Sequence, residues 1–154
     1  MDEASVTIDA APEQVWALVS DITQTGKWSP SNTGGKWIMG ASGPAVGARF
    51  IGFNKRGLAR WPTTCKVIEC EQPTRFAFQV NENKMQWGWK VDPAEGGGTV
   101  LTQWRDRVGQ PLAPIRLAAS LLFRDKLDEV MIEGMHRTLA AVKAEAESTT
   151  ATAG

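Results

Sequence analysis

The sequence is poor in the residues from which many enzymes build metal sites and acid–base pairs. Its 154 residues include one histidine, no tyrosine and two cysteines. A single histidine excludes a conventional multi-histidine metal site, and the missing tyrosines remove one group of acid–base catalysts. The phosphate-binding loop, the dinucleotide-binding glycine pattern and the nucleophile elbow of hydrolases are also missing from the sequence. We therefore expect no metal and no cofactor.

The chain also lacks net charge and long apolar runs. Seventeen Lys and Arg residues balance seventeen Asp and Glu residues, which removes the general attraction to nucleic acid. No run is long enough to span a membrane, and the acidic N-terminus carries no apolar signal segment. Cys65 and Cys70 lie in one predicted strand at an odd separation, so we expect them on opposite faces and unpaired. These features predict a cytoplasmic protein with no nucleic-acid partner and no stable membrane insertion.

The order of apolar patterns predicts an α+β chain. A short strand at 5–9 precedes a helix that begins near Pro12, and the Gly-rich segment 23–46 is expected to be a long loop with at most one helical turn. Alternating apolar residues then predict an antiparallel series of strands at 48–54, 60–71, 75–81, 84–92 and 99–108. A helix follows from about 115 to 147, with a break near 123–124. We expect one domain over 1–147 and a disordered tail at 148–154.

This order, with the residues that carry it, resembles the START-like (SRPBCC) superfamily, whose fold the birch-pollen allergen shares. The similarity is to its bacterial polyketide cyclase/dehydrase and lipid-transport branch. The matching stretches are 6–21 (VTIDAAPEQVWALVSD), Trp28, 46–50 (VGARF), 67–78 (VIECEQPTRFAF), 87–104 (WGWKVDPAEGGGTVLTQW) and the C-terminal helix. The resemblance implies a helix-grip fold, in which a curved antiparallel sheet wraps around a long C-terminal helix, with short N-terminal helices. It also implies a cavity for a hydrophobic ligand between sheet and helix; members include binders, transporters and some cyclases.

Seven tryptophans are the most unusual part of the composition. Trp16 lies on the apolar stripe of the first helix and is interpreted as core. Other aromatic and Met side chains are predicted to line the ligand cavity, because large indole rings and adaptable Met side chains suit an apolar ligand. These cavity residues are Trp61, Phe78, Trp87, Trp89, Trp104, Met131 and Met135. Trp28 and Trp37, on the Gly-rich segment, are predicted at the cavity mouth. The alternative is that all of these side chains simply fill the interior.

Charge is unevenly distributed along the chain. Residues 1–21 contain five acidic residues and no basic one, whereas residues 22–68 contain seven basic residues and no acidic one. A basic region at the mouth would favour an anionic group on the ligand, and Arg49 and Arg60 are the preferred mouth residues. The alternatives are a solvated basic surface, or a surface that contacts an anionic membrane.

The sequence favours binding over catalysis without deciding between them. The weak catalytic candidates are Asp106, which is predicted to share a strand face with Trp104, and His136, which helical geometry places away from the apolar face. We predict binding, and by extension transport, of a hydrophobic or amphipathic small molecule, with an anionic end as one option. The alternatives are a cyclase or dehydratase acting on a polyketide-like substrate, and an interaction module that uses the apolar residues of 115–123. The chain is expected to be a monomer or a homodimer.

Overall fold

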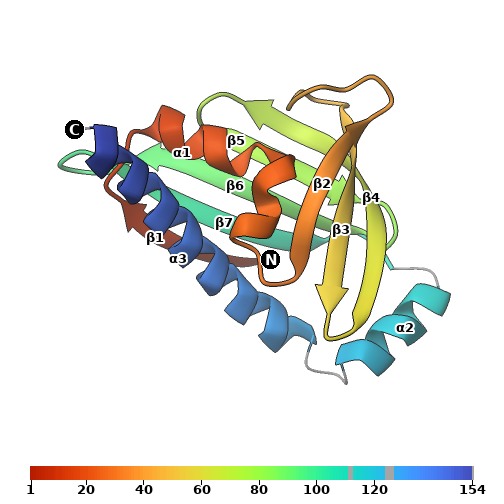
Figure 1. Cartoon of the computed structure of the whole chain (residues 1–154). Helices are drawn as coiled ribbons and strands as arrows, with labels where there is room; N and C mark the ends of the chain where they lie inside the picture. The colour runs from red at the N-terminus through yellow and green to blue at the C-terminus, as the bar shows by residue number, and fades with distance from the viewer. Residues whose placement is uncertain (111–112, 124–126, 154) are drawn as a thin grey trace.

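The computed structural model describes residues 1–110, 113–123 and 127–153. Its helices and strands follow the order shown in Figure 1. They are β1 (Asp2–Ile8), α1 (Pro12–Val19), the 3-10 helix η1 (Ile22–Lys27), β2 (Asn32–Ile38), β3 (Arg49–Arg56), β4 (Ala59–Glu71), β5 (Arg75–Val80), β6 (Met85–Pro93), β7 (Thr99–Arg107), α2 (Ala113–Phe123) and α3 (Leu127–Ala153).

The seven strands form one antiparallel sheet in the order β1-β7-β6-β5-β4-β3-β2. Helices α1 and α3 and the 3-10 helix η1 cover the same face of this sheet, and α3 crosses it diagonally (Figure 1). We call this covered side the concave face and the other side the convex face. A curved sheet, one long C-terminal helix and short N-terminal helices confirm the predicted helix-grip fold.

The core lies between the concave face and the helices. Side chains alternate between faces along each strand, and the buried members of the concave set include Phe50, Cys65, Val67, Phe76, Val80, Trp89, Val91 and Leu101. Full burial of one such large side chain contributes about 1.5–3 kcal/mol. From the helices, α3 adds Leu139, Val142 and Ala146 to the same cluster.

Helix α1 forms where the sequence predicts it. Pro12 begins the helix, where its missing N–H costs nothing and its fixed φ is compatible with the first turn. Val15, Trp16 and Val19 lie on one side and are buried against the sheet. The Trp16 indole also donates a hydrogen bond to the carbonyl of Arg75 at 3.1 Å. Trp16 is therefore a core residue that attaches α1 to the start of β5.

The predicted loop at 23–46 is only partly correct, because this segment contains η1 and the edge strand β2. Gly34 and Gly35 interrupt the apolar pattern that would otherwise indicate a strand. At Gly35 a side chain cannot be accommodated, since a Cβ atom would lie 2.8 Å from the Ile22 carbonyl oxygen. The close approach that glycine permits thus packs η1 directly on β2.

The predicted facing of the two cysteines is wrong. A β-bulge between Val67 and Glu69 shifts the register of β4 by one residue. As a result Cys65, opposite Val80, and Cys70, opposite Phe76, both turn toward the concave face. Both are free thiols, as expected.

Helix α3 is longer than predicted. It continues to Ala153, so the segment expected to be disordered from Ser148 is helical up to that residue. The run of Ala and Glu is compatible with a helix, and the Thr149 hydroxyl donates a hydrogen bond to the Glu145 carbonyl at 3.0 Å. The predicted break at 123–124 agrees with the end of α2 at Phe123, although residue 124 lies outside the described residues. Within the described chain, no helix combines the length and apolar character needed to cross a bilayer.

Candidate ligand-binding face

Two aromatic side chains at the centre of the concave face remain partly open. Phe78 and Trp87 are opposite each other in the register of β5 and β6, and both are half-buried. Their strands lie in the interior of the sheet and have a neighbouring strand on either side. Both side chains point to the concave side, so their exposed parts are accessible from that side of the sheet.

The aromatic surface extends from Phe78 toward the β2 edge. Phe50 packs edge-on against Phe78 with ring centroids 5.1 Å apart, and Trp37 packs edge-on against Phe50 at 5.5 Å. Edge-to-face pairs of this kind favour a fixed arrangement of the rings. Trp61 belongs to the same face of β4 as Cys65 and is half-buried. Strands β3–β6 thus each place at least one aromatic side chain on the concave face.

Helix α3 contributes differently along its length. Its C-terminal half supplies Leu139, Val142 and Ala146 to the core cluster, which includes neither Met131 nor Met135. Met135 is nevertheless buried, and Met131 is half-buried. Their flexible thioethers are suited to contact with varied apolar groups.

Polar groups also occur on this face, in β7. Gln103 is opposite Trp89 and Arg105 is opposite Trp87, with exposed fractions of 8% and 3%. Arg105 Nε donates a hydrogen bond to Asp2 Oδ2 at 2.9 Å. The buried Oε1 of Gln103 has no hydrogen-bond partner among the described residues. A buried acceptor without a partner costs about 1–3 kcal/mol, so a hydrogen-bond donor at this oxygen would be stabilising.

The structure brings together most of the predicted cavity side chains. Trp61, Phe78, Trp87 and Trp89 share the concave face of the sheet. Of the two predicted mouth tryptophans, Trp37 is half-buried on the concave face of β2 beside Phe50. Trp28 is buried within the core cluster at the end of η1, in place of the predicted mouth position.

Trp104 does not belong to this group, and its predicted facing is wrong. It is opposite Gly88 in the register and lies on the convex face, where a Cβ at Gly88 would come within 2.2 Å of the indole. Asp106 shares the convex face with Trp104, opposite Gln86, and lies 3.7 Å from the N-terminal ammonium. The predicted sharing of a face by these two residues is correct, but it is the face away from the helices.

The two arginines predicted at the mouth are also on the convex face. Arg49 is opposite Lys66, and Arg60 is opposite Lys55, at positions that alternate with the concave residues Phe50 and Trp61. Both side chains are exposed. Arg105, in contrast, lies on the concave face and was not among the predicted site residues. In β7, one face carries Leu101, Gln103 and Arg105, and the other carries Val100, Thr102 and Trp104. Because the second set contains an aromatic residue, the sequence predicts that this set faces the helices, and that prediction is wrong.

His136 lies on the outer side of α3 and is exposed. It borders a groove of about 430 Å³ between β1 and α3, together with Ser5, Val6, Leu139, Ala140, Lys143, Ala144 and Glu147. Lys143 Nζ crosses this groove and donates hydrogen bonds to the Thr7 carbonyl at 2.8 Å and to Glu147 at 2.7 Å. Of the two catalytic candidates, His136 therefore borders the groove beside β1, and Asp106 lies on the convex face near the N-terminal ammonium.

Burial suppresses the reactivity of the Cys65 thiol on the concave face. Desolvation raises the pKa of the Cys65 thiol to about 12, although a contact with the Thr63 hydroxyl acts in the opposite direction. Because the thiolate is the reactive form, Cys65 stays a neutral apolar group at physiological pH. The concave face consequently offers apolar contact at Cys65, with hydrogen-bonding groups at Gln103 and Arg105.

Comparison with known proteins agrees with this architecture. A family model described as polyketide cyclase/dehydrase and lipid transport matches residues 3–147. A polyketide-cyclase-like protein from Corynebacterium glutamicum is 33% identical, with a TM-score of 0.59 over 92% of this chain and 88% of that one. No curated protein matches the chain.

More distant structures share the fold. A Bacillus halodurans protein is 18% identical, with a TM-score of 0.69 over 94% of this chain and 95% of that one. The di-domain ARO/CYC StfQ from the steffimycin biosynthetic pathway is 16% identical, with a TM-score of 0.74 over 97% of this chain and 51% of that one. At these identities the similarity demonstrates the fold alone.

Proposed function

The chain belongs to the polyketide cyclase/dehydrase and lipid-transport family, and from this premise we propose that it binds an amphipathic small molecule on the concave face. The apolar body of the ligand contacts Trp87 and Phe78, and its polar end lies toward Gln103 and Arg105. The observation that carries this proposal is the partial exposure of two aromatic side chains at the centre of the sheet, beneath the helices.

The apolar part of the proposal is supported by the character of the surface. Aromatic and Met side chains bury a large area against a ligand, at about 25 cal/mol per Å² before the cost of association. On α3, Met135 is buried and Met131 is half-buried, and neither belongs to the core cluster. In a close-packed core, large apolar side chains on central strands are normally fully buried. A ligand-binding face, in contrast, needs apolar side chains that stay partly exposed.

The polar part is supported by the two β7 residues. Arg105 is a permanently charged donor held by Asp2, and Gln103 Oε1 is an acceptor that lacks a partner among the described residues. A hydroxyl group can both accept from Arg105 and donate to Gln103 Oε1, whereas a carboxylate can only accept from Arg105. The ligand class is therefore an apolar molecule with an oxygen-bearing end, and the basic residues at 49 and 60 take no part in it.

Catalysis is not part of the proposal. Asp106 is on the convex face and His136 is on the outer side of α3. Neither lies where a ligand held against Trp87 would present its reacting atoms.

The test has two stages. Native mass spectrometry of protein purified without detergent should reveal a bound small molecule, or the protein should bind 1-anilinonaphthalene-8-sulfonate with a rise in fluorescence. Displacement of this probe by decanoate and by decanol then measures the contribution of the polar end. Absence of both a co-purified molecule and probe binding would refute the proposed function.

A matched pair of variants tests the assignment to β7. Arg105→Gln should weaken the binding of decanoate more than that of decanol, because only the carboxylate gains a charge-assisted hydrogen bond. Arg75→Gln is the control, since Arg75 also pairs with an aspartate, Asp92, at 3.1 Å, but on the convex face. Equal effects of the two substitutions on decanoate binding would contradict the role given to Arg105.

A further inference from the structure

We propose that the convex face of β2–β4 docks on an anionic lipid bilayer. This inference is independent of the concave ligand and concerns five basic residues on the convex face, which we call the basic strip: Lys36, Arg49, Lys55, Arg60 and Lys66.

The strand register brings the basic strip together. Lys66 is opposite Arg49, and Lys55 is opposite Arg60, so four of the five form two cross-strand pairs on one face of β3 and β4. Lys36, on β2, is opposite Ile51 of the same face. The strip extends for roughly 20 Å along β4, the length of six residues in a strand. The sequence alone does not show that the five residues share one face, because they are spread over 31 positions from 36 to 66.

The charges of the basic strip are not neutralised by ion pairs among the described residues. Like charges placed opposite each other destabilise a sheet, yet two such pairs occur on the convex face, one toward each end of β3. None of the five forms an ion pair with an acidic side chain in the part of the chain that the structure describes. Two acidic residues border the strip near Lys66. Glu69 follows the bulge on the convex face of β4, opposite Ala77, and the Glu82 carboxylate accepts hydrogen bonds from the Thr64 amide and hydroxyl. An external anionic surface would relieve the repulsion.

Exposed apolar side chains accompany the charges. Phe53, 43% exposed, lies between the two basic pairs and opposite Pro62. Leu58, at the tip of the β3–β4 hairpin, is fully exposed. The tip is held in shape by Arg60, whose Nη1 donates hydrogen bonds to the carbonyls of Gly57 at 2.7 Å and Ala59 at 2.9 Å. A projecting leucine flanked by lysine and arginine is suited to the boundary between lipid headgroups and acyl chains.

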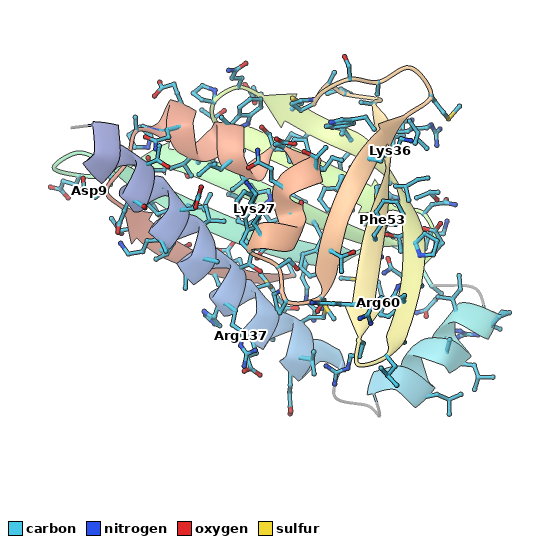
Figure 2. The ribbon with its side chains drawn as sticks, viewed as in Figure 1. Asp9, Lys27, Lys36, Phe53, Arg60 and Arg137 are labelled. Atoms are coloured by element: carbon cyan, nitrogen blue, oxygen red, sulfur yellow. The ribbon has the colours of Figure 1, made fainter. Side chains whose placement is uncertain are left out.

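The remaining charges orient the molecule. Of the five acidic residues of 1–21, Asp2, Glu3, Asp9 and Glu13 lie in or next to β1 and α1, whereas Asp21 caps η1; β1 is the edge strand farthest from β2 in the sheet. Figure 2 shows Lys36, Phe53 and Arg60 on the β2–β4 side and Asp9 at the opposite end of the molecule. An anionic surface would attract the first side and repel the second, so the protein would approach with β2–β4 leading.

A bilayer suits these observations better than nucleic acid does. The strip combines cations with an apolar tip that nucleic acid has no means of burying, whereas a bilayer accepts both. The strip presents one aromatic side chain, Phe53, and not the series on which successive bases stack.

Co-sedimentation with vesicles tests the proposal. The protein should bind vesicles of phosphatidylcholine with phosphatidylserine, should bind phosphatidylcholine vesicles much less, and should dissociate as salt is raised. Lys55→Gln/Lys66→Gln should lower the partition coefficient about 30-fold, since each basic residue near an anionic surface contributes about fivefold. Arg60 is left unchanged because it also shapes the hairpin. The control Lys27→Gln/Arg137→Gln removes the same charge from η1 and α3 and should have little effect.

A second pair tests the apolar tip. Leu58→Ser should lower binding about tenfold, as expected for a leucine that loses burial in the bilayer. Met39→Ser is its control, because Met39 is 81% exposed but lies in the β2–β3 loop, at the other end of β3. Equal binding to neutral and anionic vesicles, or equal losses in a test variant and its control, would overturn the proposal. Tighter binding to a single-stranded oligonucleotide than to anionic vesicles would also overturn it. Unchanged circular dichroism verifies that every variant is folded.

Discussion

Replacing Trp87 by alanine should weaken ligand binding, and replacing Trp104 should not. The two residues are the same type on neighbouring strands, but Trp87 lies on the concave face and Trp104 on the convex face. A tryptophan presents about 150–250 Å², and a half-buried one leaves roughly a third of that, about 60 Å², to a ligand. At about 25 cal/mol per Å² this area contributes about 1.5 kcal/mol, so Trp87→Ala should raise Kd about tenfold.

The assay is a fluorescence titration with 1-anilinonaphthalene-8-sulfonate, with near-ultraviolet circular dichroism to verify that each variant is folded. Trp104→Ala should leave the Kd unchanged while lowering the free energy of unfolding by about 2 kcal/mol, less than the loss for a fully buried tryptophan. This stability loss is expected because the indole covers Gly88 on the convex face.

Two results would refute the reasoning. A Kd that rises equally in both variants would indicate that binding depends on general stability and not on the concave face. A Kd that rises only in Trp104→Ala would place the ligand on the other side of the sheet.

Three further predictions concern the packing and chemistry around this face. Gly88→Ala should lower the free energy of urea unfolding by about 1–3 kcal/mol, because the added Cβ would lie 2.2 Å from the Trp104 indole. Adding Trp104→Ala should recover part of this loss. If no stability is recovered, the contact is contradicted. Cys70 should react with Ellman's reagent in the native protein, whereas Cys65, whose pKa burial raises to about 12, should react only on unfolding; equal native rates would exclude the buried position of Cys65. Burial acts to raise the pKa of Asp21, but hydrogen bonds from Thr23 and Gln24 outweigh it and lower that pKa from 3.8. The ionised Asp21 side chain therefore contributes its full stability at a pH above its unfolded-state pKa, and this contribution is lost as the pH falls through the lower folded-state pKa. Asp21→Ala should lower the free energy of urea unfolding by about 1 kcal/mol at neutral pH and by less at acidic pH. A loss that is independent of pH would contradict this role.

Much of the architecture could be predicted from local patterns. Large apolar residues two positions apart, such as Phe76 and Phe78 or Trp87 and Trp89, indicate strands with one apolar face. This pattern does not depend on which strands pair with them. Pro12 begins a helix for reasons that act within a few residues. The order of these elements, with a long amphipathic helix at the C-terminal end, leaves few ways to bury the apolar faces.

The errors share a physical origin in β-sheet register. In β7 the residues 101, 103 and 105 compete with 100, 102 and 104 for the concave face, and each set contains both apolar and polar members. Pairing with β6 and β1 decides the matter by placing Gln103 and Arg105 inward. In β4 one additional residue in the bulge reverses the facing of Cys70.

The sequence by itself determined the types and order of the elements, the helix-grip fold and the presence of an acid-free basic segment, because each depends on periodicity or composition along the chain. Only the tertiary structure decided which side of the sheet each charge and each tryptophan occupies. A strand places its side chains on two opposite faces with a period of two, so a shift of one residue exchanges the faces. That exchange moved Trp104, Arg49 and Arg60 to the convex face and brought Arg105 to the side that faces the helices.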